Sequence, residues 1–168
     1  IGVEVTSPKV AIQTRKISSS AIQSIAFQYD TDGKLISVAS DLNNDGNVDS
    51  QQSYEYNSDG LVSHISESSV RDELLSYNAD NNLVSRIRSG SAVTPAEEIY
   101  SYDDGKLEKL EIDIDHDGSI DKATTLSYNP QGKLSSSEQD KNGDSVPDRA
   151  ALLDYQNNVV KTYSEDID

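Results

Sequence analysis

A tyrosine followed by a turn sequence recurs six times along the chain and constrains its fold more than any other feature. Each tyrosine precedes Asn, Asp or Gln, and then residues such as Gly, Asn and Asp that reach positive φ at little cost. The copies are 21 to 27 residues apart and begin at Tyr29, Tyr56, Tyr77, Tyr102, Tyr128 and Tyr155. Because short runs of β-favouring residues flank each copy, the repeat predicts a series of β-hairpins.

The flanking runs alternate with a period of two, which is the period of a β-strand. Ile25, Phe27 and Tyr29 share one face, and Tyr54 and Tyr56 repeat the pattern in the next copy. Leucines follow most of the turns, so tyrosine and leucine rows are expected to pack across neighbouring strands. No segment keeps a helical apolar period, although residues 106–112 (KLEKLEI) also fit one helical turn.

The hairpins predict an all-β fold: an antiparallel up-and-down meander of about twelve strands in a curled or shell-like sheet. Six tyrosine turns lie at one end of the strands, and five connections lie at the other end. Residues 21–168 form this repeat domain, and residues 1–20 form an N-terminal strand, a linker or an assembly arm. The pattern leaves open whether the sheet closes into a barrel, curls as a shell or stays open.

Three of the five connections are acidic runs with one spacing: DLNNDGNVD at 41–49, DIDHDGSID at 113–121 and DKNGDSVPD at 140–148. Oxygen-bearing side chains at positions one, three, five and nine converge in a tight loop, and position seven adds a backbone carbonyl. Hard oxygen ligands of this kind suit Ca²⁺. The sequence therefore predicts about three calcium ions, held by Asp41, Asn43, Asp45, Asn47 and Asp49, by Asp113, Asp115, Asp117, Ser119 and Asp121, and by Asp140, Asn142, Asp144, Val146 and Asp148.

The acidic runs differ from EF-hands in two ways. Position twelve holds Gln52, Thr124 or Ala151 in place of a bidentate glutamate, and no flanking helices are expected. The third run also has Ser145 at position six, where the other two runs have glycine. We therefore expect structural ions, rather than a conformational sensor, and a weaker or more strained third site.

The tyrosine-turn copies, such as YDTDGKL and YNPQGKL, resemble the YD repeats of bacterial shell-forming and surface proteins. This resemblance covers most of residues 21–168 and implies a long meandering sheet that curls. The acidic runs resemble the calcium loops of integrin-type propellers and of thrombospondin type 3 repeats, and DKNGDSVPD is nearest to the latter. The overall layout of those two families does not match, so the resemblance implies only the ligand pattern.

Composition narrows the classes of partner and compartment. The formal charge is −16, which disfavours nucleic acid and anionic membrane surfaces. The chain lacks cysteine, so it has neither a disulfide nor a thiolate metal site. No apolar run approaches the roughly 18 residues of a membrane-spanning helix, so membrane insertion is not expected.

Ile1 in place of Met indicates a removed signal segment or a cut chain. Calcium loops of this kind work best where calcium is plentiful, so we expect a secreted or cell-surface protein.

No catalytic constellation stands out, so the sequence predicts a protein without enzymatic activity. His64 is expected on a strand and His116 at position four of the second acidic run, facing away from the ion. Neither has a cysteine or an evident serine partner. The clustered carboxylates are already assigned to cations.

Two functions remain open. The first is an extracellular, calcium-stabilised structural repeat in a bacterial surface fibre, adhesin or shell. An open meander has unpaired edges, so an N-terminal strand around Val3 and Val5 could pair with a neighbouring copy and build a filament. The second is a calcium-dependent binding module for a polysaccharide or a surface protein, with the tyrosine rings stacking on sugars.

Overall fold

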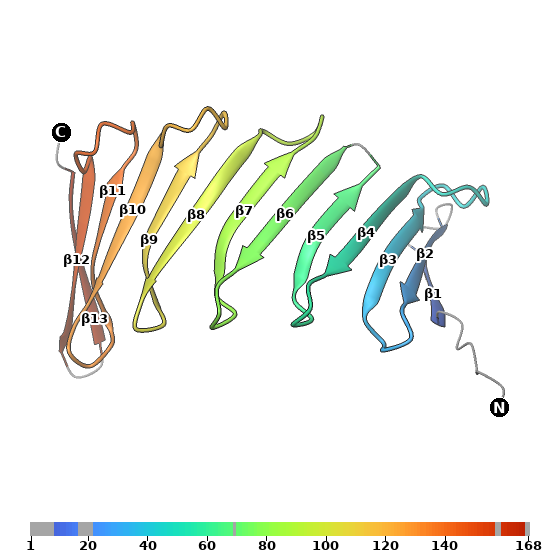
Figure 1. The fold of residues 1–168 in the computed structure, drawn as a ribbon, viewed down its shortest axis with the longest axis horizontal. Helices are drawn as coiled ribbons and strands as arrows, with labels where there is room; N and C mark the ends of the chain where they lie inside the picture. The colour runs from blue at the N-terminus through green and yellow to red at the C-terminus, as the bar shows by residue number, and fades with distance from the viewer. Residues whose placement is uncertain (1–8, 17–21, 69, 157–158, 167–168) are drawn as a thin grey trace. The chain divides into compact units, whose positions relative to one another are not determined.

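The computed structural model describes residues 9–16, 22–68, 70–156 and 159–166, and it describes side chains within residues 24–155 apart from residue 69. These residues form thirteen β-strands and no helix (Figure 1). No helix that could cross a membrane is therefore present in this part of the chain. The strands are β1 (Lys9–Lys16), β2 (Ile22–Tyr29), β3 (Leu35–Asp41), β4 (Ser50–Tyr56), β5 (Val62–Glu67), β6 (Arg71–Tyr77), β7 (Leu83–Ser89), β8 (Ala96–Asp103), β9 (Lys106–Asp113), β10 (Lys122–Tyr128), β11 (Leu134–Asp140), β12 (Arg149–Gln156) and β13 (Val159–Asp166).

The predicted fold class is confirmed: the protein is an antiparallel up-and-down meander whose strand order is the chain order. The six turns and five connections join β2 to β13, which are the twelve strands expected. One strand is additional to the expected twelve: β1 lies inside the segment assigned to the N-terminal arm and pairs along its whole length with β2. The Val3–Val5 stretch lies outside the described residues. Residues 106–112 belong to β9, so the helical alternative for this segment is wrong.

The chain divides into two compact units. The first comprises the described residues up to Leu74 together with Gly90–Val93, and the second comprises Leu75–Ser89 and the described residues from Thr94 onward. Within each unit the strands are joined by local connections to the next strand along the chain.

Most of the tyrosine turns share one hydrogen-bonding pattern. In the Tyr56 turn, Asn57 Oδ1 accepts the backbone N–H groups of Asp59 at 3.1 Å and Leu61 at 2.9 Å. The same side-chain position accepts the same two N–H groups at Asp30, Asn78 and Asn129. This is the Asx-turn geometry that favours Asn and Asp after the tyrosine.

A β-bulge accompanies the tyrosine in at least four hairpins. The register shifts between Gln28 and Tyr29 and at the equivalent steps before Tyr56, Tyr102 and Tyr128. Each bulge inserts one residue into one strand and increases the local twist. The pairs farther from the turn than the tyrosine are therefore shifted by one residue, so that Gln28 faces Ser37 instead of Ile36.

The expected tyrosine–leucine rows are present on one face of the sheet. Tyr100 pairs with Leu110, Tyr102 with Leu107, and Tyr128 with Leu134. These rows lie on a single layer of strands. Ala96 is the only hydrophobic residue that is buried among the described side chains. Cross-strand rows, rather than an enclosed core, therefore account for the apolar packing of the described residues.

Lysines couple one hairpin to the next at the turn end. Tyr128 in the fifth turn donates its hydroxyl to the Leu107 carbonyl of the fourth turn at 2.8 Å, while Lys106 Nζ lies 5.6 Å from the Tyr128 ring centroid. Tyr56 donates to Leu35 at 2.7 Å beneath Lys34, and Lys133 lies over the Tyr155 ring. The Gly-Lys-Leu sequence after a turn is thus the docking position for the next tyrosine.

Candidate metal centres in three acidic loops

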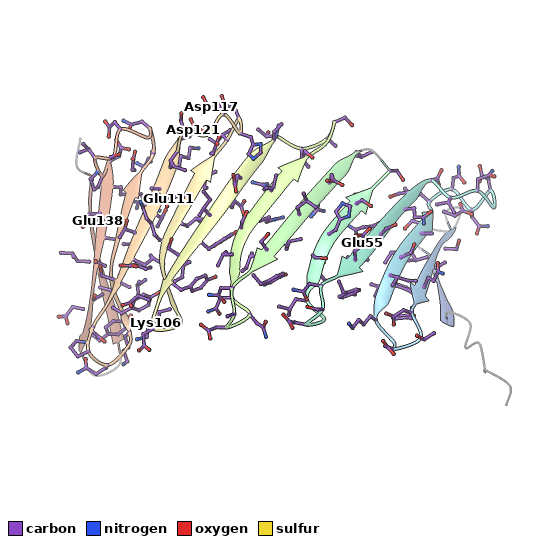
Figure 2. All side chains as sticks on the ribbon, in the orientation of Figure 1. Glu55, Lys106, Glu111, Asp117, Asp121 and Glu138 are labelled. Carbon is purple, nitrogen blue, oxygen red and sulfur yellow. The ribbon has the colours of Figure 1, made fainter. Side chains whose placement is uncertain are left out.

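All fifteen predicted ligand residues lie in three loops at the end of the strands opposite the tyrosine turns. Loop 1 (41–49) joins β3 to β4, loop 2 (113–121) joins β9 to β10, and loop 3 (140–148) joins β11 to β12. Figure 2 shows Asp117 and Asp121 of loop 2 at this end and Lys106 at the turn end. Loop 1 belongs to the first unit, and loops 2 and 3 belong to the second.

One backbone bond and one side-chain bond close each loop in the same way. The N–H of position nine donates to the carbonyl of the residue before position one, at 2.8 Å in loop 1, 2.9 Å in loop 2 and 2.8 Å in loop 3. The carboxylate of position nine accepts the N–H of position two, at 2.7, 2.7 and 2.5 Å. Asp49, Asp121 and Asp148 are therefore tied to the start of their own loops.

The carboxylate at position one organises the turn that follows. Asp41, Asp113 and Asp140 each accept the N–H of position six on Oδ2, at 2.9, 2.8 and 2.9 Å. Asp41 and Asp113 are buried, with 9% and 2% of their surface exposed. Burial raises the pKa of Asp113, but N–H donors from Gly118, His116 and Asp117 outweigh it and hold the pKa below its usual value. Burial also raises the pKa of Asp140, but backbone N–H donors, led by Gly143 and Ser145, outweigh it and hold the pKa below its usual value.

Position five completes the same pattern. The carboxylates of Asp45, Asp117 and Asp144 accept the N–H of position seven, at 2.8, 2.7 and 2.8 Å. Position seven holds Asn47, Ser119 and Val146, the three residues predicted to offer a carbonyl. The hydrogen bond from Asn47 is the main cause of the lowered pKa of Asp45.

Loop 2 brings three carboxylates closest together. Oxygens of Asp113, Asp115 and Asp117 lie within 4.8 Å of one another. In loops 1 and 3 the third position is an asparagine whose amide nitrogen donates to position five, from Asn43 to Asp45 at 3.2 Å and from Asn142 to Asp144 at 3.3 Å. All three loops therefore place side-chain oxygens from positions one, three and five on one short segment. A hard divalent cation would neutralise them.

The displaced glycine of loop 3 has a structural explanation. Positions four and six both have positive φ in every loop, and each loop places glycine at one of them. Loop 1 has Asn44 at 59° and Gly46 at 87°, whereas loop 3 has Gly143 at 76° and Ser145 at 68°. A Cβ at Gly143 would lie 2.4 Å from the Ile120 carbonyl oxygen of loop 2. Glycine is therefore needed at position four of loop 3 because loop 2 packs against it.

The two histidines lie beside carboxylates rather than beside nucleophiles. His64 on β5 is 2.7 Å from Asp72 Oδ1 through Nε2 and 3.5 Å from Glu55 Oε1 through Nδ1. The hydrogen bond with Asp72 is the main cause of its raised pKa. His116, at position four of loop 2, lies 3.4 Å from Glu97.

A polar cluster on β7 and β8 is not predictable from the sequence. Glu98 of β8 accepts a hydrogen bond from Arg88 at 2.8 Å and from the Tyr100 hydroxyl at 2.5 Å. Burial and the Glu98 carboxylate raise the pKa of Tyr100 to about 12. Arg86 and Arg88 alternate along β7, but only the strand register shows that Arg86 faces Glu98.

Comparisons with known proteins give no family. No protein-family model and no curated protein matches the chain. A chain in the crystal structure of TcdB2-TccC3-Cdc42 is 12% identical in sequence to this chain, with a TM-score of 0.39. The match covers 81% of this chain and 9% of the other. The crystal structure of TcdB2-TccC3 is 12% identical with a TM-score of 0.39, covering 77% and 9%.

A porin-like protein from Bacteroides uniformis ATCC 8492 is 10% identical with a TM-score of 0.24, covering 92% of this chain and 93% of that chain. The present chain spans about 9% of the length of the first two structures. Similarities of this size carry no argument about function.

Proposed function

We propose that the chain is a calcium-stabilised structural repeat protein, and we assign it no catalytic activity. The observation that supports this function is the common hydrogen-bonding pattern of loops 1, 2 and 3. The same bonds recur at positions one, two, five, six, seven and nine, although the three loops differ in sequence.

Calcium would supply what a single-layer sheet lacks. The three loops concentrate ten carboxylates, and among the described side chains only one apolar residue is buried. A cation that binds the folded loop neutralises its carboxylates and holds two strand ends together. Its binding free energy then contributes to folding. The side chains at positions one, three, five and nine and the carbonyl at position seven are the proposed ligands in each loop.

A calcium titration combined with thermal unfolding tests the proposal. Saturation of one site at 100 times its Kd adds about 2.7 kcal/mol, which is roughly 5–10 °C in Tm for a domain of this size. We expect isothermal titration to show about three sites and chelation to lower the Tm by at least that amount. Asp117→Asn should remove one site, whereas Glu108→Gln, which removes a charge outside the loops, should leave the count unchanged. An identical Tm with calcium and with chelator contradicts a structural role for the ion.

We place the protein outside the cell, in a bacterial surface fibre, adhesin or shell. Two features support this location: the resemblance to YD repeats, and loops suited to the high calcium concentration of extracellular fluids. Fractionation of the native source tests it, because recovery only from the cytoplasm would rule it out.

Assembly by strand addition is part of the same proposal. In the strand order, β1 and β13 each have one neighbour, so each has one open edge to which another copy could add. Because β1 already pairs with β2 of its own chain, a strand from another copy would lie beside β1 and would not replace it. Sedimentation and electron microscopy with calcium should show polymers that disappear when residues 1–20 are removed. A strictly monomeric full chain would contradict assembly.

A calcium-dependent module for binding polysaccharide is the second candidate. Two matching depressions support it, with volumes of about 320 and 430 Å³ at the fourth and fifth tyrosine turns. Lys106 and Tyr128 line one, and Lys133 and Tyr155 line the other, so an aromatic ring recurs in equivalent positions. A glycan array with calcium separates the two candidates, because a complete absence of bound glycans leaves the structural function alone.

A further inference from the structure

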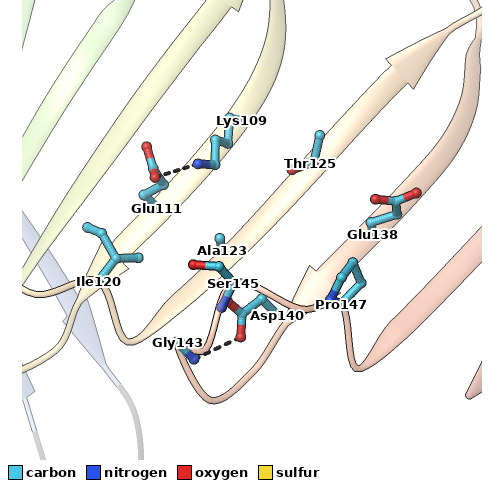
Figure 3. Close-up of a pocket in the computed structure, with 10 residues that line it drawn as sticks. All are labelled: Lys109, Glu111, Ile120, Ala123, Thr125, Glu138, Asp140, Gly143, Ser145 and Pro147. Carbon is cyan, nitrogen blue, oxygen red and sulfur yellow. Dashed lines mark hydrogen bonds and ion pairs between the residues drawn. The ribbon is translucent and has the colours of Figure 1, made fainter. Parts of the chain in front are cut away.

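A trough crosses β9, β10 and β11 on the face opposite the tyrosine rows. In the strand register, Thr125 of β10 lies between Lys109 and Glu138, and Ala123 lies between Glu111 and Asp140. The central strand thus carries short side chains, while both flanking strands carry longer, charged ones. Figure 3 shows these walls and the end of the trough at loop 3, where Gly143, Ser145 and Pro147 contribute.

The size of the trough suits part of a polypeptide. Its volume is about 420 Å³, within the roughly 300–1,000 Å³ of ligand sites. Its width is two strand spacings, about 9.6 Å between the backbones of the flanking strands. An extended side chain can lie along β10 over Ala123 and Thr125 while its end group contacts a wall.

The charge of the trough favours a cation. Glu111, Glu138 and Asp140 contribute three carboxylates, and Lys109 is the single cation among the lining residues. Asp140 already accepts the backbone N–H groups of Asn142, Gly143 and Ser145 in its own loop. Lys109 Nζ lies 2.6 Å from Glu111 Oε1, so these two charges compensate each other. Glu138 is exposed and forms no hydrogen bond or ion pair with the side chains that the structure describes. Glu138 is therefore the carboxylate of this lining that is left to attract a cationic ligand and to repel an anionic one.

We propose that this trough binds an arginine-bearing segment of a partner protein, with Glu138 as the anchoring residue. The planar guanidinium matches both oxygens of a carboxylate, which an ammonium group does not. The apolar stem of the arginine covers Ala123 and the methyl group of Thr125. The proposal does not depend on calcium, because Glu138 and both floor residues lie outside the acidic loops.

Fluorescence anisotropy with a labelled peptide of alternating arginine and glycine tests the proposal on the full chain. Measurements in chelator and in calcium separate this site from the calcium loops. Glu138→Gln removes the anchoring charge, and Ala123→Leu fills the floor without changing the charge. Glu138→Gln should weaken binding by about tenfold, the effect of losing one charge-assisted contact. Ala123→Leu should weaken it by a similar factor, because its side chain occupies the space of the arginine stem. Glu108→Gln is the matched control and should change the affinity less than about twofold, as expected of an exposed charge away from the contact.

Several results would overturn the proposal. An equal loss for Glu108→Gln and Glu138→Gln would show that the peptide responds only to net charge. Unchanged binding by Ala123→Leu would show that the trough is not the site. Thr125→Leu, at an exposed position, provides the same steric test if Ala123→Leu does not fold, as judged by circular dichroism. A lysine peptide of equal spacing should bind more weakly than the arginine peptide, and equal binding would remove the role assigned to the guanidinium.

Discussion

Gly143 shows how one residue can serve both its own loop and the neighbouring one. Its φ of 76° favours glycine, and the missing side chain makes room for the Ile120 carbonyl. The sequence predicted only that the third acidic loop is unusual. Because the contact joins two connections that are 20 or more residues apart, no local pattern reveals it.

Gly143→Ala should destabilise the second unit more than Gly118→Ala does. Both substitutions place alanine at positive φ, at a cost of about 1–2 kcal/mol. Only the first brings a Cβ to 2.4 Å from a backbone oxygen, because nothing lies within 4 Å of the equivalent point at Gly118. Overpacking adds about 1–3 kcal/mol, and urea unfolding of the two variants measures the difference. Equal losses would mean that loop 3 moves away from loop 2 at no cost.

His64 predicts a pH dependence in the first unit. Its pKa is raised above the model-peptide value of 6.5, mainly by Asp72 and also by Glu55, which flank it from β6 and β4. Its contribution to stability is therefore complete below pH 6.5 and is lost as the pH rises through the folded-state pKa. The Tm difference between the wild type and His64→Gln should shrink across that window. A difference that is constant with pH would contradict the assignment.

An NMR titration of His64 in two variants identifies the cause of its raised pKa. Asp72→Asn should lower the pKa of His64 more than Glu55→Gln does, because Asp72 is at 2.7 Å and Glu55 is at 3.5 Å with a 73% exposed side chain. Equal shifts in the two variants would assign the raised pKa to general charge rather than to the hydrogen bond.

At the scale of the elements, the Lys–Tyr contact is the link between successive hairpins. Tyr128→Phe removes the hydroxyl bond to Leu107 and should cost about 0.5–1.5 kcal/mol. Lys106→Met removes the cation above the ring and should cost about 0.5–1 kcal/mol. Lys122→Met, at an exposed position on β10, is the control. A double-mutant cycle of Lys106→Met with Tyr128→Leu, which removes the ring as well, should show coupling in urea unfolding. Additive losses would show that the two residues act separately.

The repeat made the hairpins predictable, but it did not reveal their register. Alternation places Tyr54 and Tyr56 on one face, and the structure agrees. It cannot show that a bulge between Glu55 and Tyr56 shifts the pairs beyond it, so that Glu55 faces His64 instead of Ser63. Contacts that depend on the register, such as His64 with Asp72 or Lys106 with Tyr128, therefore became visible only in three dimensions. The acidic loops were recognisable from spacing alone because all their ligand positions lie within nine consecutive residues.

At the scale of the whole molecule, the absence of an enclosed core among the described side chains predicts local unfolding. Each strand packs on the strands beside it, as in other one-dimensional arrays. Tyr128→Ala should therefore increase hydrogen exchange in β9, β10 and β11 and leave β2, β3 and β4 unchanged. Exchange measured by mass spectrometry separates the segments. A uniform increase over both units would show that the chain unfolds as a single cooperative body.

The order of the strands also bears on how the molecule would respond to mechanical load. The connections whose residues are described all link a strand to its immediate neighbour, and β1 and β13 end the order. Tension applied through the two termini would therefore act first on the outermost ladders and peel them away one after another. A cation bound in an acidic loop would resist this peeling when it reached the two strands that the loop joins, so calcium would limit how far the chain extends under a given force.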